Sequence, residues 1–574
     1  MENNGALLSL YINCWMHTEH SESQRMILII DDSPMYRTAA KGMLLKLGYS
    51  ANAIDFAQDA REALIKCSNT QYSMVFFDYN LGMKANGFQL IDELDTRGLL
   101  GPDCIKIIVT GDSTPEVVRG FMELQPDGYL LKPLNYATLR QRLPQFSSKK
   151  RALKETLKLM GDHQYEAAIK SIDEAFFRSE DIIVRSQILK AQCLIATEQL
   201  DEARLILNNL KDSGEKSTVF LMLAQIEYQQ RNFTQALKFA SAVKTDPFKA
   251  AQATECCGDI YAAQHQYSKA IQEIEIALKI SPKVISRHHK QIDYCIASFE
   301  LESALAACKG LISEVKHSFR DTPTPYMLAA ALTTDLAQFS LEETRESYLM
   351  SISKSVEHWR RKFTRDEYKG IELLLFCRIH HLKNDFHKSR EYFKEYLMLC
   401  QENSEREIDL YESIEFAKAA FCTHDIVRYK QANAQVVQRL RNETDTLAAY
   451  ARYNYFKQFR NKIETTYSHT KRVKEKAKAY FDEKEYQKAA QLVSKAVANN
   501  VFDSQICLIT LQVLTQAWPH GWNSTQVLRL ALFCKEQLRN TRYIQSKIYV
   551  SACNNLAQQL QHSDLQITET MAVN

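Results

Sequence analysis

The N-terminal part of the chain alternates short apolar runs with segments of helical periodicity. Five runs have the length and the β-branched or aromatic content of buried strands. Between and after them, apolar residues recur at three- and four-residue intervals, as in helices that cover a sheet. This alternation predicts an α/β domain with a doubly wound, five-stranded parallel sheet. The expected strands are Met26–Ile30, Ala53–Ala57, Met74–Phe77, Ile105–Val109 and Tyr129–Leu131, and the expected helices are 35–47, 59–68, 87–97, 115–124 and 135–143.

Polar side chains follow four of the predicted strands. Asp31 and Asp32 come directly after the first strand, Asp78 after the third, Thr110 after the fourth and Lys132 after the fifth. In a sheet of flavodoxin-like order the first and third strands are neighbours, and ligands bind at the carboxyl ends of the strands. We therefore expect these side chains to share one rim of the sheet.

The three carboxylates on this rim predict a cation site. Carboxylates this close together cannot all ionise comfortably without a positive charge nearby. A ligand set made only of oxygen atoms, with room for waters, favours Mg²⁺ over zinc. The expected cofactor is therefore Mg²⁺, with the Lys132 ammonium group beside it.

The same residues resemble the receiver domain of response regulators, the phosphoacceptor half of two-component signalling. The motifs that carry the resemblance are DD at 31–32, D-x-N at 78–80, T-G at 110–111 and K-P at 132–133, and they span nearly the whole of residues 26–144. The resemblance implies that Asp78 is a nucleophile phosphorylated by a sensor histidine kinase.

The resemblance also implies roles for the surrounding residues. Asp32, Asp78 and the backbone carbonyl of Asn80 would hold Mg²⁺, with Asp31 acting mainly through water. Thr110 and Lys132 would bind the phosphoryl oxygens. Tyr129 would be the aromatic switch that turns inward when Thr110 moves.

One loop departs from the receiver pattern. The stretch YNLGMKANGF, residues 79–88, lacks the usual proline after Leu81 and is one residue longer before Gly87. Asn80 and Asp112 are the variable side chains that we expect to influence attack of water on the acyl phosphate. Phosphate lifetime and kinase choice stay open at this point.

Beyond a polar connector, 145–150, the strand runs stop and an internal repeat begins. Small residues recur at separations of 35, 33, 34 and 34, and an apolar or aromatic residue stands three positions before each. A period near 34 is the signature of tetratricopeptide repeats, whose helix pairs stack into a solenoid. The repeat-packing residues are Ala168, Ala203, Ala236, Ala270 and Ala304, with Gly258 and Tyr261 completing the best copy, and the preceding residues are Tyr165, Leu200, Phe233, Tyr267 and Leu301.

The repeat pattern weakens toward the C-terminus. Two segments, Gly370–Phe393 and Ala477–Val497, still fit it. We expect an N-terminal extension at 1–25 without fixed structure, a receiver at 26–144, the connector at 145–150, tetratricopeptide-like repeats at 151–314 and a further helical, solenoid-like region at 315–574. Met16 and Met26 are alternative start sites.

Composition limits the classes of function. The chain has 72 Lys and Arg against 69 Asp and Glu, without a long block of like charges, which disfavours a general polyanion-binding role. Fourteen cysteines without metal-ligand spacing indicate core residues of a reducing cytosol. Histidines at 288–289, 380–381 and 387 are expected to be exposed, and KRVKEKAK, residues 471–478, to be a solvated helix face.

Three hypotheses about function remain. The first is a cytoplasmic response regulator whose repeats bind a signalling protein, such as a kinase or another regulator. The second is a competing phosphoacceptor or kinase-docking decoy that damps phosphotransfer to another regulator. The third is a DNA-binding transcription regulator, which would need a basic recognition helix in 315–574. In none of these hypotheses do we expect membrane insertion, or enzymatic activity beyond the receiver's own phosphorylation and dephosphorylation. Under the first two we also expect no binding of nucleic acid.

Overall fold

The computed structural model describes residues 26–82, 86–112, 114–340, 342–383, 385–402, 406, 408–423, 425–498, 503–538 and 542–567. The expected extension at 1–25 lies outside these residues. The chain divides into two compact units. The first runs to Tyr294 and includes Gly310–Asp321, and the second comprises Cys295–Lys309 and the chain from Thr322 onward. Among the described residues, no helix is both long enough and apolar enough to cross a membrane.

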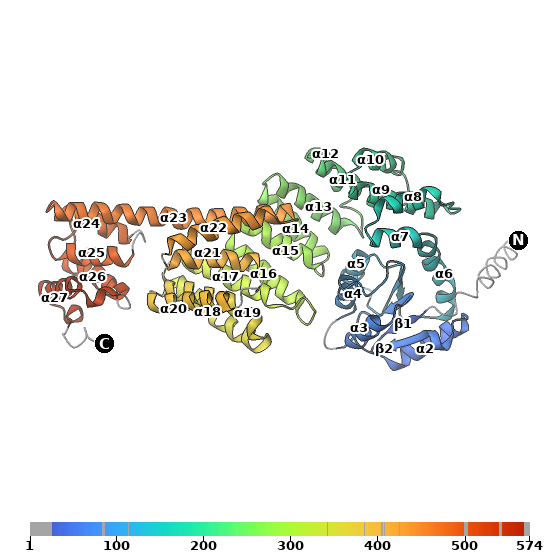
Figure 1. Ribbon diagram of the computed structural model, residues 1–574, viewed down its shortest axis with the longest axis horizontal. Helices are drawn as coiled ribbons and strands as arrows, with labels where there is room; N and C mark the ends of the chain where they lie inside the picture. The colour runs from blue at the N-terminus through green and yellow to red at the C-terminus, as the bar shows by residue number, and fades with distance from the viewer. Residues whose placement is uncertain are drawn as a thin grey trace, which may run out of the picture. The chain divides into compact units, whose positions relative to one another are not determined.

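A five-stranded parallel sheet forms the core of the N-terminal domain (Figure 1). The strand order is β2-β1-β3-β4-β5, which confirms the flavodoxin-like fold and places the first and third strands side by side. Ile30 at the end of β1 pairs in register with Phe77 at the end of β3. The strands are β1 Ile27–Ile30, β2 Ile54–Ala57, β3 Met74–Phe77, β4 Ile105–Thr110 and β5 Gly128–Leu131.

Five helices cover both faces of the sheet. On one face, side chains of α3, α4 and α5, among them Leu94 and Phe121, pack against Val75 and Phe77. On the other face, Leu44 of α2 and Leu139 of α6 pack against the alternate strand residues. Every residue of β1 and β3 is therefore buried, which explains their continuous apolar runs in the sequence. The helices are α2 Pro34–Lys46, α3 Ala60–Asn69, α4 Gly87–Thr96, α5 Pro115–Glu123 and α6 Tyr136–Ala152.

Helix α6 is longer than the sequence predicts. The pattern indicates a helix over 135–143 and a connector at 145–150, whereas α6 continues to Ala152 with Pro144 inside it. The amino group of Lys150 lies 2.7 Å from a carboxylate oxygen of Asp127. Residues 145–150 are therefore part of α6 and not a separate connector. The contact between Lys150 and Asp127 holds the last turns of this helix against the sheet domain.

Helix pairs follow in the order that the repeat predicts. The second helix of each pair, α8, α10, α12, α14 and α16, begins at the apolar residue that marks its repeat. Two positions earlier, a residue with φ between 58° and 62° ends the first helix of the pair in the left-handed region. The pairs are α7 Lys154–Gly161 with α8 Tyr165–Glu174, α9 Glu180–Ala196 with α10 Leu200–Asn209, α11 Lys216–Gln229 with α12 Phe233–Ala242, α13 Ala250–Ala263 with α14 Tyr267–Ile280, and α15 Ile285–Ala297 with α16 Leu301–Val315.

The predicted repeat-packing residues lie where the two helices of a pair approach each other. The five alanines have no exposed surface. A Cβ atom at Gly258 would lie 3.4 Å from the carbonyl oxygen of Ala270, so this glycine lets α13 approach α14 closely. Tyr261 is half-buried and packs beside the cluster that contains Ala236. The regular spacing of small residues therefore reflects helix contact.

The second unit is helical in the residues described. Two of its pairs repeat the earlier pattern. Phe386 opens α20 with Ser389 buried three residues later, and Tyr486 opens α24 after Lys484, whose φ is 61°. The helices are α17 Pro323–Phe339, α18 Glu342–Lys362, α19 Arg365–Leu382, α20 Phe386–Glu402, α21 Leu410–Cys422, α22 Ile426–Arg441, α23 Thr446–Asp482, α24 Tyr486–Ala498, α25 Ser504–Leu514, α26 Ser524–Leu538 and α27 Lys547–Leu560.

Candidate phosphoacceptor site

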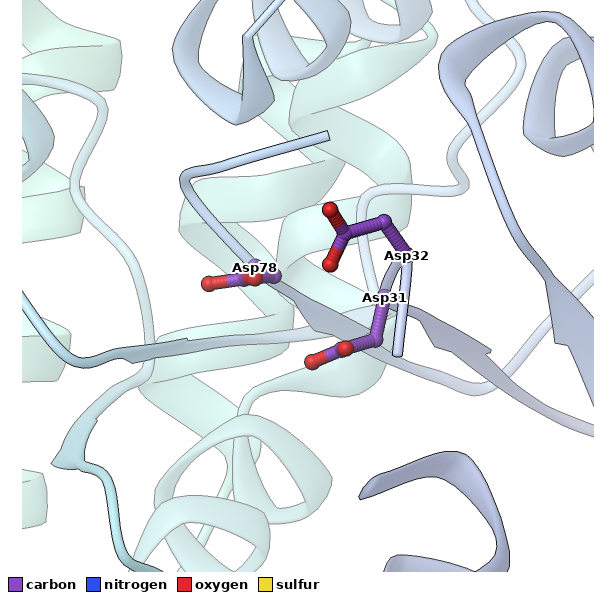
Figure 2. Close-up of side chains that lie close together, drawn as sticks. All are labelled: Asp31, Asp32 and Asp78. Carbon is purple, nitrogen blue, oxygen red and sulfur yellow. The ribbon is translucent and has the colours of Figure 1, made fainter. Parts of the chain in front are cut away.

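Three carboxylates gather at the carboxyl ends of β1 and β3 (Figure 2). One oxygen from each of Asp31, Asp32 and Asp78 lies within 4.8 Å of the other two. Asp31 is fully buried and Asp78 is 5% exposed, whereas Asp32 is exposed. They meet because β1 and β3 are hydrogen-bonded neighbours that end in register. The structure therefore brings together the acidic residues that the sequence places on one rim.

Lys132, just after β5, bridges two of these carboxylates. Its Nζ atom lies 2.7 Å from Asp31 Oδ2 and 2.8 Å from Asp78 Oδ2. Burial disfavours its charged form, but the hydrogen bonds with Asp31 and Asp78 outweigh burial and raise the pKa of Lys132. For Asp78, burial has the largest effect and raises the pKa of the carboxyl, although Lys132 opposes it. The ammonium group thus balances part of the negative charge.

Backbone atoms of Asp112 connect Thr110 to Tyr129. Thr110, the last residue of β4, is fully buried, and its hydroxyl accepts a hydrogen bond of 3.0 Å from the Asp112 amide. The Tyr129 hydroxyl donates to the Asp112 carbonyl at 3.1 Å. Tyr129 is half-buried, and its hydroxyl is hydrogen-bonded to the β4–α5 loop. A movement of this loop would disturb both side chains.

The loop after β3 is held close to Asp78 by Gly87. The Gly87 amide donates to the Tyr79 carbonyl at 2.8 Å, and a Cβ atom at Gly87 would lie 2.0 Å from the Asp78 carbonyl oxygen. Only glycine fits this contact without a backbone shift. Asn80 lies exposed on the same loop, while residues 83–85 of the lengthened segment lie outside the described residues.

The donor set fits Mg²⁺. The carboxylates provide only oxygen ligands, and an exposed Asp32 leaves access for water, which Mg²⁺ usually retains. Asp32 and Asp78 would be the direct ligands, together with the Asn80 carbonyl, and Asp31 would act through water. Lys132 balances only one of the three negative charges, so a divalent cation would offset the other two.

One side chain of this site, Tyr36, was not predicted from the sequence. It lies in the first turn of α2, and Lys132 Nζ is 4.5 Å from the centre of its ring. Its hydroxyl is buried without a hydrogen-bond partner among the described residues. Burial, together with the charges of Asp31 and Asp78, raises the pKa of this hydroxyl. An aromatic residue four positions after the acidic pair was the available signal, but it also fits a core position of α2.

The other candidate residues are structural. The prediction of exposed histidines is confirmed for His289 and His387, whereas His380 and His381 are half-buried. It is wrong for His288, which is 6% exposed with its Nε2 atom 2.8 Å from the Pro282 carbonyl oxygen. His380 has a carboxylate neighbour, with Nδ1 3.3 Å from Asp385. In the basic run, Lys474 pairs with Asp503 at 2.7 Å. All described cysteines except two of intermediate exposure are buried, as expected for core residues.

Comparison with protein families assigns both regions. The response regulator receiver domain matches residues 27–144, and a tetratricopeptide repeat-like domain matches residues 140–292. A gliding motility regulatory protein of Myxococcus xanthus is 30% identical over 106 residues, which are 18% of this chain and 13% of that protein. The transcriptional regulatory protein PcoR of Escherichia coli is 29% identical over 120 residues, which are 21% of this chain and 50% of that protein. The chain thus spans half or less of the length of these relatives.

Solved structures match over the same N-terminal region. A CheY-like receiver domain protein from Methanospirillum hungatei JF-1 is 26% identical, with a TM-score of 0.20, and the match covers 22% of this chain and 98% of that one. The response regulator TrrA of Thermotoga maritima, solved with Mg²⁺ and BeF, is 24% identical with a TM-score of 0.18, over 21% of this chain and 98% of that one. From the family matches and the sheet order, the N-terminal domain of this chain is a response regulator receiver domain, and the helical region that follows begins with a tetratricopeptide repeat-like domain.

Proposed function

We propose that this two-component response regulator accepts a phosphoryl group on Asp78 from a sensor histidine kinase, and that its repeats bind a signalling protein as the output. The observation that carries the proposal is the buried Asp78 carboxylate, which shares Lys132 with Asp31 beside a third carboxylate. The proposed location is the cytoplasm. No further enzymatic activity is proposed.

The chemistry is a phosphoryl transfer between two side chains. An oxygen of Asp78 attacks the phosphorus of the kinase's phosphohistidine, the new O–P bond forms as the P–N bond breaks, and the imidazole leaves with the bonding electron pair. The Lys132 ammonium group and the Thr110 hydroxyl would bind the phosphoryl oxygens as their charge redistributes. Bound Mg²⁺ would supply further neutralisation of charge at the same oxygens.

Mass spectrometry of the intact protein tests the acceptor. With acetyl phosphate and Mg²⁺, the wild-type chain should gain one phosphoryl group, and Asp78→Asn should gain none. Asp201→Asn is the matched control, because Asp201 is 91% exposed on α10 and distant in sequence from the site. An adduct of unchanged yield in Asp78→Asn would show that the acceptor lies elsewhere.

The repeats are tested by the dependence of partner binding on the receiver. The full chain is used to capture proteins with and without beryllofluoride and Mg²⁺, and affinity for each captured protein is then measured with the Asp78→Asn variant beside the wild type. An affinity that changes with beryllofluoride in the wild type alone supports a gated output. Unchanged affinity, with altered phosphate flux from the kinase, supports the competing phosphoacceptor.

A further inference from the structure

Two arginines of the repeat region hold the receiver through its helices α4 and α5. Arg287, near the start of α15, donates to both carboxylate oxygens of Glu123 on α5, at 2.7 and 2.5 Å. Arg320, after α16, donates to both carboxylate oxygens of Asp92 on α4, at 2.6 and 3.0 Å, and also to Thr96 at 3.0 Å. All of these residues belong to the first compact unit. We call these two bidentate pairs the arginine clasp.

The Arg287–Glu123 pair is buried, and another residue of the repeat region orients Arg287. Arg287 has no exposed surface, and the Glu123 side chain is 8% exposed. Glu255 of α13 accepts a hydrogen bond from Arg287 Nε at 2.8 Å, and its other oxygen lies 2.7 Å from Lys290. The guanidinium group is therefore oriented by the preceding helix pair of the repeat region. Loss of Glu123 alone would leave a buried, permanently charged group with unpaired donors, which is strongly unfavourable.

Polar contacts of α4 add to the clasp. The side-chain amide of Gln89 donates to the carbonyl oxygen of Glu314 at 3.1 Å, and to that of Lys316 at 3.4 Å. These carbonyls lie in the last turn of α16 and just beyond it, where helix carbonyls lack partners within the helix. The receiver therefore satisfies backbone groups of the repeats as well as their charges.

Packing connects both clasped helices to the phosphoacceptor. Gly87, the first residue of α4, contacts the Asp78 carbonyl, as described above. The ring of Phe121 on α5 lies 5.7 Å from that of Tyr79, the residue after Asp78, in an edge-to-face arrangement. Phe121 stands two positions before Glu123. The β4–α5 loop that precedes α5 is tied to Thr110 and Tyr129 through Asp112.

From these contacts we propose that the arginine clasp is an intramolecular lock between receiver and repeats, and that a phosphoryl group on Asp78 loosens it. This inference rests on the function proposed above. Binding of the phosphoryl group by Thr110 would move the β4–α5 loop and with it α5, which carries Glu123. By linkage, opening of the clasp must then favour the phosphorylated state by the same factor.

The test measures how tightly the full chain binds beryllofluoride with Mg²⁺. Arg320→Gln removes the more exposed pair and leaves the buried one intact, so the fold is retained. The variant should bind beryllofluoride about fivefold more tightly than the wild type, at the lower end of usual coupling factors. Arg361→Gln, a matched change at an arginine 82% exposed in the second unit, should have no effect. Equal or weaker binding by Arg320→Gln overturns the proposal.

A charge swap and hydrogen exchange make the test specific. Asp92→Arg combined with Arg320→Asp should restore wild-type affinity, which a general structural disturbance would not do. In the wild type, beryllofluoride should speed amide exchange in α5 and in residues 310–321. Beryllofluoride that binds without changing exchange there refutes the lock but keeps the receiver function. A protein that does not bind it at all refutes the proposed function itself.

Discussion

Replacement of Gly87 by alanine tests how closely α4 packs against the backbone of Asp78. The new Cβ atom would lie 2.0 Å from the Asp78 carbonyl oxygen and 3.1 Å from Tyr79 Cα. Ordinary contacts of this kind begin near 3.4 Å, so the start of α4 and the β3–α4 loop must separate by more than 1 Å. Because both atoms are backbone, no side chain can rotate away. Overpacking of this kind costs about 1–3 kcal/mol.

Gly42→Ala is the matched control within the same domain. Gly42 lies inside α2, and a Cβ atom added there would have no neighbouring atom within 4 Å. Alanine there should stabilise the receiver by roughly 0.5–1 kcal/mol, because glycine is the poorer helix former. The two substitutions are chemically identical but should change the stability of the receiver domain in opposite directions.

Hydrogen exchange of the β3 amides measures both effects, because slowly exchanging core strands report the opening free energy of their own domain. Gly87→Ala should also slow the formation of the acyl phosphate, since it displaces Asp78. If Gly87→Ala protects β3 as well as the wild type does and leaves the rate of phosphorylation unchanged, then the close approach of α4 to Asp78 is refuted.

Three further substitutions probe charge and packing. In the absence of divalent cations, Asp78→Asn should become more stable than the wild type as pH rises. Burial raises the pKa of the Asp78 carboxyl, so its ionised form is less favoured in the folded than in the unfolded state, and the wild type loses stability as pH climbs from about 3.9 through the raised pKa. Urea titrations from pH 3 to pH 7 should show that the difference in stability between the two proteins vanishes in acid. Lys132→Gln should slow phosphorylation by acetyl phosphate in a time course of intact mass, since two carboxylates lose their shared cation; an unchanged rate would contradict its role. Asp335→Ala should destabilise the second unit by about 3–5 kcal/mol, because the buried Arg378 and Lys418 lose a shared partner. Hydrogen exchange of the α19 amides measures this loss, and wild-type protection of α19 in the variant would refute the estimate.

The strand positions and the acidic rim were predictable because β1 and β3 are buried along their whole length and each is followed directly by an aspartate. The turns of the repeats were recognisable only through their period, since the left-handed positions are occupied by His163, Glu198, Arg231, His265 and Phe299, and none of these is glycine. Spacing of small residues nevertheless located the start of every second helix in these five pairs. The spacing of small residues at helix contacts therefore predicts the repeats better than the residues of the turns do.

Long-range ion pairs could not be predicted. Arg287 and Glu123 are 164 residues apart, and each resembles an ordinary helix-surface charge in the sequence. The same is true of Asp335, Arg378 and Lys418 in the second unit, which lie on three helices and meet in a buried network. Tyr36 was missed for a related reason, because its pattern also fits the core face of α2. Local periodicity assigns residues to a face but does not identify their partners across the fold.

Chemical trapping directly locates the residue that carries the phosphoryl group, which we propose to be Asp78. Borohydride reduces an aspartyl phosphate to homoserine. The tryptic peptide Cys67–Lys84 contains Asp78 and no other acidic residue, while Asp31 and Asp32 fall in a different peptide, Met26–Arg37. After treatment with acetyl phosphate and Mg²⁺ and then with borohydride, homoserine should appear at position 78. Homoserine at position 31 or 32, or none in either peptide from a protein shown to carry the phosphoryl adduct, would mean that Asp78 is not the acceptor.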